Sequence, residues 1–152
     1  MPFQLAVDAF AQGDRIPRRH TCEGENLSPS LSWKGEPAGV RSFALIMDDP
    51  DAPGGTWNHW LLFDIPPSVH SLAEGHKAGQ DSTSGANDFG KLGYGGPCPP
   101  RGHGPHRYFF RLYALGVPGL KVPRGAKRSE IDRALRGHVL AEAQYMGRYE
   151  RK

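Results

Sequence analysis

Two histidines and one carboxylate stand at the ends of apolar segments of this 152-residue chain, where they can form a small polar site. His59 belongs to the apolar stretch 57–65, and His106 opens the aromatic-rich stretch 106–115. Both stretches follow loops that are dense in glycine and proline, and Asp49 ends a third apolar stretch. If the three ends meet, protonated histidines can donate hydrogen bonds to an anion. A carboxylate nearby would raise the histidine pKa above its usual value of about 6.5, and burial would lower it.

The loop before His106 has the composition of an anion cradle. Glycine lacks a Cβ, so backbone N–H groups in this loop can curl around an oxyanion and let it approach closely. The glycines are Gly95, Gly96, Gly102 and Gly104. Prolines stiffen the loop and lower the entropy cost of ordering it, and they stand at Pro97, Pro99, Pro100 and Pro105. An apolar rim is available from Trp57, Trp60 or Tyr108.

Simpler interpretations of these residues stay open. A histidine on an apolar strand face is often a hydrogen-bonded core residue, and Asp-Pro and Gly-Pro steps often mark only turns. Arg101 and Arg107 are expected to be solvent-facing charges or partners of Asp48 and Asp51. Two histidines and a carboxylate could hold a metal for hydrolysis, but no HxH or HExxH spacing presents them together.

The two cysteines, Cys22 and Cys98, form no CxxC pair, which gives little support to a zinc site or a disulfide framework. We favour two separate buried thiols, with a single bridge as the alternative in an oxidising compartment. A Cys98 nucleophile activated by histidine and aspartate is a weaker alternative. The sequence contains no GxSxG motif of the kind that presents a nucleophilic serine.

The elements that position these residues are predicted to be short strands. Alternating apolar residues predict strands over 3–7 and 31–33. The stretch 42–49 is apolar on both parities, as in a central strand covered on two faces. Parity places His59 on one face with Trp57, Leu61, Phe63 and Ile65. Parity likewise places His106 on one face with Tyr108, Phe110, Leu112 and Ala114.

The remaining segments are a long loop and a predicted helix. The segment 66–94 is rich in glycine, serine and proline with a short element at 68–72, and long loops of this kind are often functional. Near the C-terminus, apolar residues recur every fourth position at Ile131, Leu135, Val139 and Ala143. Ser129 is a good N-cap, with Asp132 three residues on. Gly137 costs about 1 kcal/mol relative to alanine, so we expect two short helices or a kinked one, ending near Gly147.

Composition limits the class of protein. A chain of 152 residues is expected to form one domain, residues 1–152, with one core. Gly 20 plus Pro 14 favours short strands joined by many turns. The net charge of +3 is scattered along the chain, which argues against nucleic-acid binding. The longest apolar runs, 43–47 and 60–63, are too short to span a membrane, and no leader pattern opens the chain, so we expect a cytoplasmic protein.

Four sequence blocks together resemble one known family. The blocks DDPDAP (48–53), GTWNHWLLFDIP (55–66) and GGPCPPRGHGPHRYFFRLYAL (95–115) resemble the signature blocks of the phosphatidylethanolamine-binding protein family. The block HTCEGENLSPSLSW (20–33) resembles the N-terminal block of its bacterial and archaeal branch, called Raf kinase inhibitor-like. The blocks follow the family's order and spacing and cover nearly the whole chain, which makes the resemblance specific.

The resemblance implies a mainly β fold: an antiparallel β-sandwich, here with short C-terminal helices. It also implies a pocket at one end that binds phosphate-like groups and phospholipid head groups. Carried over position by position, the ligand-binding residues are Asp49, His59, Gly96, Pro99, Pro100, His106 and Tyr108, supported by Asp51 and Trp57. Pro97 and Cys98 replace the small serine and glycine of animal members, which bears on ligand preference.

Residues and resemblance together predict a non-enzymatic binding protein for a small anion or phosphorylated ligand, without a cofactor. The first alternative is a kinase or protease inhibitor that uses the pocket rim and the loop 66–94 as its contact surface. The second is a metal-assisted hydrolase using the same histidines. Relatives can dimerise, so we expect a homodimer, with peripheral membrane contact at most.

Overall fold

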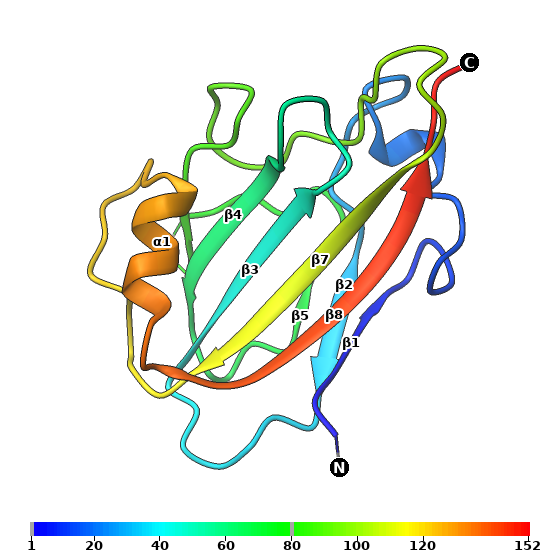
Figure 1. Cartoon of the computed structure of the whole chain (residues 1–152). Coiled ribbons are helices and arrows are strands. Elements are labelled where there is room, and N and C mark those ends of the chain that lie inside the picture. The colour runs from blue at the N-terminus through cyan, green and yellow to red at the C-terminus, as the bar shows by residue number, and fades with distance from the viewer. Residues whose placement is uncertain (1, 80) are drawn as a thin grey trace.

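Within residues 2–79 and 81–152, which the computed structural model describes, the chain forms two antiparallel sheets packed face to face (Figure 1). The small sheet has the order β1 (Gln4–Val7), β2 (Leu31–Lys34) and β5 (Ser71–Leu72). The large sheet has the order β6 (Thr83–Ser84), β4 (Trp57–Ile65), β3 (Ser42–Asp49), β7 (His106–Leu115) and β8 (Val139–Tyr149). A 3-10 helix η1 (Arg18–His20) precedes β2, and α1 (Arg128–Leu135) precedes β8. The predicted mainly β sandwich is confirmed.

Apolar side chains fill both faces of the large sheet. Between the sheets, Leu5 and Trp33 belong to one buried cluster with Phe43 and Leu112. The other face of β3 and β4 packs against α1 through a second cluster, which contains Ile46, Leu61, Phe63, Ile131 and Leu135. All residues of β3 are buried, as predicted for a central strand covered on two faces.

The predicted parity of β4 is wrong for Leu61 and Phe63 because the strand contains a bulge, whereas Ile65 joins the inner cluster as predicted. Met47 pairs with Trp60 whereas Asp48 pairs with Asn58, so His59 has no opposite residue on β3. The extra residue puts His59 on the inner face together with its neighbour Trp60. Consequently Leu61 and Phe63, which parity placed beside His59, pack on the α1 side instead. The predicted parity of β7 is confirmed, since Tyr108, Phe110, Leu112 and Ala114 all join the inner cluster.

The predicted helix ending near Gly147 is also wrong beyond Leu135. Gly137 adopts φ 80, a left-handed conformation that ends the helix, and the chain then pairs with β7 as β8. The period of two in β8 brings Ala143 and Tyr149 to the inner cluster, and the open edge of β7 supplies the backbone partners. The helix begins earlier than predicted: Lys127 is its N-cap, and the Glu130 carboxylate accepts the Lys127 backbone N–H at 3.0 Å.

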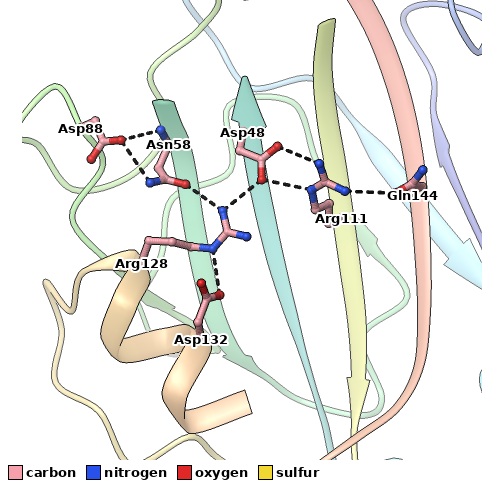
Figure 2. A network of polar contacts seen from close by, with 7 residues as sticks. All are labelled: Asp48, Asn58, Asp88, Arg111, Arg128, Asp132 and Gln144. Atoms are coloured by element: carbon pink, nitrogen blue, oxygen red, sulfur yellow. Dashed lines mark hydrogen bonds and ion pairs between the residues drawn. The ribbon is translucent and has the colours of Figure 1, made fainter. Parts of the chain in front are cut away.

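A buried carboxylate joins α1 to the large sheet (Figure 2). Asp48, only 2% exposed, accepts hydrogen bonds from Arg111 at 3.0 and 3.1 Å and from Arg128 at 3.0 Å. Arg128, on α1, also donates to Asn58 of β4 at 2.8 Å and to Asp132 at 2.9 Å. The network therefore connects β3, β4, β7 and α1 through one carboxylate.

We expect Asp48→Ala to lower the free energy of unfolding by about 3 kcal/mol, because it strips two partly buried guanidinium groups of their shared partner. Arg107→Ala is the matched control, since Arg107 lies on β7 like Arg111 but pairs with Asp51 at the surface. That variant should lose about 1 kcal/mol or less. Urea unfolding of both variants checks the difference, and equal losses would contradict the role given to Asp48.

Candidate functional site

A cavity of about 230 Å³ lies where β3 ends and β4 and β7 begin. It brings together most of the predicted site residues: Asp49, Trp57, His59, Pro99, Pro100, His106 and Tyr108. Its other lining residues are Ala52, Pro53, Phe89 and Cys98. Gly96 and Asp51 do not line it.

His106 is oriented by hydrogen bonds on both sides of its ring. Its Nδ1 lies 2.7 Å from the Asp49 carboxylate, and both side chains are almost fully buried. The other Asp49 oxygen accepts the backbone N–H of Asp51 at 2.8 Å. On the far side of the ring, His106 Nε2 lies 2.7 Å from His103 Nδ1. Asp49, His106 and His103 therefore form a chain of groups that share protons.

His59 is held in one orientation by the backbone of the pocket loop. Its Nδ1 donates to the carbonyl oxygen of Gly95 at 2.6 Å, so in the neutral ring Nε2 carries a lone pair. Its ring packs edge-on against Tyr108 and Phe89. Burial lowers the pKa of His59 below its usual value, against a smaller opposite effect of the Gly95 carbonyl and the Asp49 carboxylate. An anion that accepts a hydrogen bond from Nε2 must therefore favour uptake of a proton.

Tyr108 contributes a buried hydroxyl that meets no acceptor at hydrogen-bond distance and angle among the residues that the structure describes, with the Asp49 carboxylate nearby. Burial, and then the nearby Asp49 carboxylate, raise the pKa of Tyr108, so the hydroxyl keeps its proton. A buried donor without a partner costs roughly 1–3 kcal/mol. This hydroxyl is consequently a ready donor for a ligand in the cavity.

Three of the glycine N–H groups that were predicted to cradle an anion are instead hydrogen-bonded within the protein. The N–H of Gly95 donates to His59, that of Gly96 to the Asn26 side chain and that of Gly102 to Arg151, each at 2.9 Å. A Cβ at Gly96 would collide with the carbonyl oxygen of His20. Glycine is required there by close packing of two chain segments, because no side chain fits between them.

Cys22 and Cys98 form a disulfide, so the prediction of two separate thiols is wrong. A bridged Cys98 has no thiol, and the alternative of a cysteine nucleophile falls with it. The bridge fixes the pocket loop to the segment after η1, where Cys22 N–H also donates to Pro97 at 3.1 Å. Sequence spacing missed the pair because the two segments are far apart in the chain.

Charged residues around the cavity hold its walls in place. Arg107 binds both carboxylate oxygens of Asp51 at 2.9 Å, and this partner holds the pKa of Asp51 at about 2. Pairing of Arg107 with Asp51 was one of the alternatives that the sequence left open. Asp48 pairs instead with Arg111 and Arg128. Near the C-terminus, Arg151 donates to the carbonyl oxygen of Pro99 at 2.6 Å. These contacts tie the loops on both sides of the cavity to β7 and the chain end.

Sequence reasoning missed His103 and Phe89. The HxxH spacing of His103 and His106 across a Gly-Pro turn was an available signal for the first. No local signal marks Phe89, which reaches the cavity from the long loop 66–94. Within residues 2–79 and 81–152, no group of three or more His, Cys, Asp or Glu is placed to hold a metal. In the same part of the chain, no helix is long and apolar enough to cross a membrane.

The chain belongs to the phosphatidylethanolamine-binding protein family, whose model matches residues 6–150. A UPF0098 protein of Methanothermobacter thermautotrophicus is 51% identical over 151 residues, which cover 97% of this chain and 98% of that protein. The crystal structure of Escherichia coli YbcL, described as a new member of the mammalian family, superposes with a TM-score of 0.90 at 36% identity and covers 100% of both chains. The carboxypeptidase Y inhibitor, solved with its cognate proteinase, shares the fold with a TM-score of 0.61 at 21% identity, covering 99% of this chain and 85% of that one. The resemblance to the bacterial and archaeal branch is confirmed.

We expect the double variant Cys22→Ser/Cys98→Ser to lose about 4 kcal/mol of unfolding free energy, because the bridge closes a long loop in the unfolded chain. Denaturant unfolding of the variant beside the oxidised protein measures this loss. The oxidised protein treated with a reductant should approach the variant. Unfolding of all three at the same denaturant concentration would contradict a stabilising bridge.

Proposed function

We propose that this protein is a non-enzymatic binding protein whose cavity holds a small anion, such as phosphate or the phosphate of a phospholipid head group. The observation that carries the proposal is the unpartnered Tyr108 hydroxyl, buried in one cavity with His59 and His106. Donors from two strands can converge on one oxyanion there: His59 on β4 and Tyr108 on β7, joined by His106 of β7 where the anion replaces His103 as the partner of Nε2. The cavity of about 230 Å³ suits a small ligand, since pockets for drug-sized molecules range over about 300–1,000 Å³.

The charge balance of the cavity supports a protonated anion site. Asp49 would repel an anion by itself, but it is hydrogen-bonded to His106. A proton on His59 supplies the positive charge that an anion in this cavity needs. The anion and a proton are therefore taken up together.

The bridged Cys98 supports a binding role, because it removes the sulfur nucleophile that the cavity wall would otherwise present. The bridge also bears on location. Disulfides are rare in the cytoplasm except in hyperthermophiles, so it counts against a cytoplasmic location outside such organisms. The cytoplasmic location and the homodimer stay predictions.

The first test is His106→Ala. Phosphate at 100 times its dissociation constant for this cavity should stabilise the unmodified protein by about 2.7 kcal/mol through this cavity, and the variant should lose that contribution. Thermal unfolding with and without phosphate measures both. Arg107→Ala, which removes an outward-facing neighbour on the same strand, should keep it. An unchanged phosphate effect in His106→Ala would sink the proposal.

The second test uses pH. The unfolded chain binds a proton at His59 below a pH of about 6.5, whereas burial lowers the pKa of His59 in the folded protein. The ligand-free protein should therefore lose stability as the pH falls from 6.5 through the folded pKa. Anion affinity should rise over the same range, because the bound anion needs the proton.

Calorimetric titration with sulfate at constant ionic strength checks the change in affinity, since sulfate keeps its charge over this range. His59→Asn retains a side-chain N–H for the Gly95 carbonyl but removes Nε2. That variant should show a clearly flatter dependence of affinity on pH. The same slope in both proteins would contradict a proton-taking role for His59.

A second candidate function is inhibition of a protease through a protein interface. Trp57 and Phe89 pack against each other with ring centroids 5.5 Å apart, and both are substantially exposed beside the cavity. Exposed aromatic side chains of this kind are enriched where proteins bind one another. Phe89→Ser should abolish inhibition of a purified carboxypeptidase, and an absence of inhibition by the unmodified protein would exclude this candidate for that enzyme.

A further inference from the structure

A second cavity, of about 320 Å³, lies beside the segment that leads into the pocket loop. Its walls come mainly from three segments, near Ser28, near Lys77 and from Leu92 to Tyr94. Trp60, Ser84 and Arg124 complete the lining. In the part of the chain that the structure describes, none of its lining residues is an aspartate or glutamate. The polar part of the lining therefore consists of cations and neutral groups, unlike that of the first cavity, which contains Asp49.

The two cations of this cavity are not neutralised. Within residues 2–79 and 81–152, no carboxylate lies within ion-pair distance of Lys77 or Arg124. By contrast, Arg107 and Arg128 are both paired with aspartates. Two uncompensated cations on one cavity attract an anion, and they favour a dianion over a monoanion.

A buried hydroxyl points independently to a ligand. Ser28 is 2% exposed, and its Oγ has no hydrogen-bond partner among the described residues. Asn26, beside it in the lining, uses its side-chain oxygen to accept the Gly96 N–H at 2.9 Å. The Asn26 amide NH₂ group therefore remains as a donor. A phosphate oxygen would satisfy the Ser28 hydroxyl, whose burial without a partner costs roughly 1–3 kcal/mol.

We propose that this second cavity binds a small phosphate dianion, either free phosphate or the phosphate of a monoester. Lys77 and Arg124 supply the positive charge, and the Ser28 hydroxyl and Asn26 amide are the neutral donors. The inference does not depend on the function proposed for the first cavity, because the two sites have different lining residues. Gly75 and Gly93 belong to the lining and report binding without themselves being charged.

The test is a titration of the full-length protein with inorganic phosphate at constant ionic strength, followed by the backbone amide signals of Gly75 and Gly93 in NMR spectra. Both signals should shift in a saturable manner. In Lys77→Gln/Arg124→Gln the dissociation constant from these signals should rise at least about 10-fold, as expected for the loss of charge-assisted hydrogen bonds. Arg41→Gln/Arg133→Gln removes the same charge elsewhere and should leave it within about 2-fold of the unmodified protein.

Two further variants separate this site from its alternatives. Ser28→Ala should keep or raise the unfolding free energy, because it removes an unpartnered buried group, yet weaken phosphate binding at Gly75 and Gly93 several-fold. His106→Ala should leave the same shifts intact, since it alters only the first cavity.

The same titration with glycerol 3-phosphate distinguishes a phosphate monoester from free phosphate as the ligand. A titration with acetate tests the preference for a dianion. Binding of either phosphate form supports the site. The proposal is overturned if phosphate leaves both signals in place, if the two charge-removing double variants behave alike, if Ser28→Ala binds as tightly as the unmodified protein, or if acetate matches phosphate.

Discussion

The end of β3 carries two adjacent carboxylates that are both buried, and much of the structure depends on how each is paired. Successive side chains of a strand point to opposite faces, so Asp48 and Asp49 face different sides of the large sheet. An ionised carboxylate is costly to bury unless it is paired and hydrogen-bonded. Asp48 finds Arg111 and Arg128, and this pairing fixes α1 to the sheet. Asp49 finds His106, and this pairing orients the ring that lines the first cavity.

The wall of the first cavity is held by contacts from distant parts of the chain. His59 donates a hydrogen bond to the Gly95 carbonyl oxygen, Cys98 is bridged to Cys22, and Arg151 donates to the Pro99 carbonyl oxygen. Each tie removes conformational freedom from the pocket loop. A loop that is ordered before the ligand arrives costs less conformational entropy on binding. The site is therefore preformed by cross-links of three chemical kinds: a hydrogen bond, a covalent bond and a charge-assisted contact.

The two cavities lie along one continuous segment but differ in electrostatics. Leu92 to Tyr94 line the second cavity and Cys98 to Pro100 line the first, with Gly96 between them bonded to Asn26. The first cavity balances histidines against a buried carboxylate, so its charge depends on pH. The second carries lysine and arginine without an acidic residue in its lining, so it stays cationic near neutral pH. One chain segment thus separates a proton-dependent site from a permanently cationic one.

The sequence by itself determined the long strands β3, β4 and β7, the inward face of β7, and the residue types that meet in the first cavity. These follow from local alternation of apolar residues and from the Gly/Pro loops that precede two of the strands. Only the tertiary structure decided that His59 lies on a bulge beside Trp60, that the last segment is β8, and that Cys22 reaches Cys98. It also decided that the glycine N–H groups are used inside the fold. The physical reason is the same in each case. A bulge, a strand edge, a disulfide and a backbone hydrogen bond all depend on partners far away in the chain, and local periodicity carries no information about them.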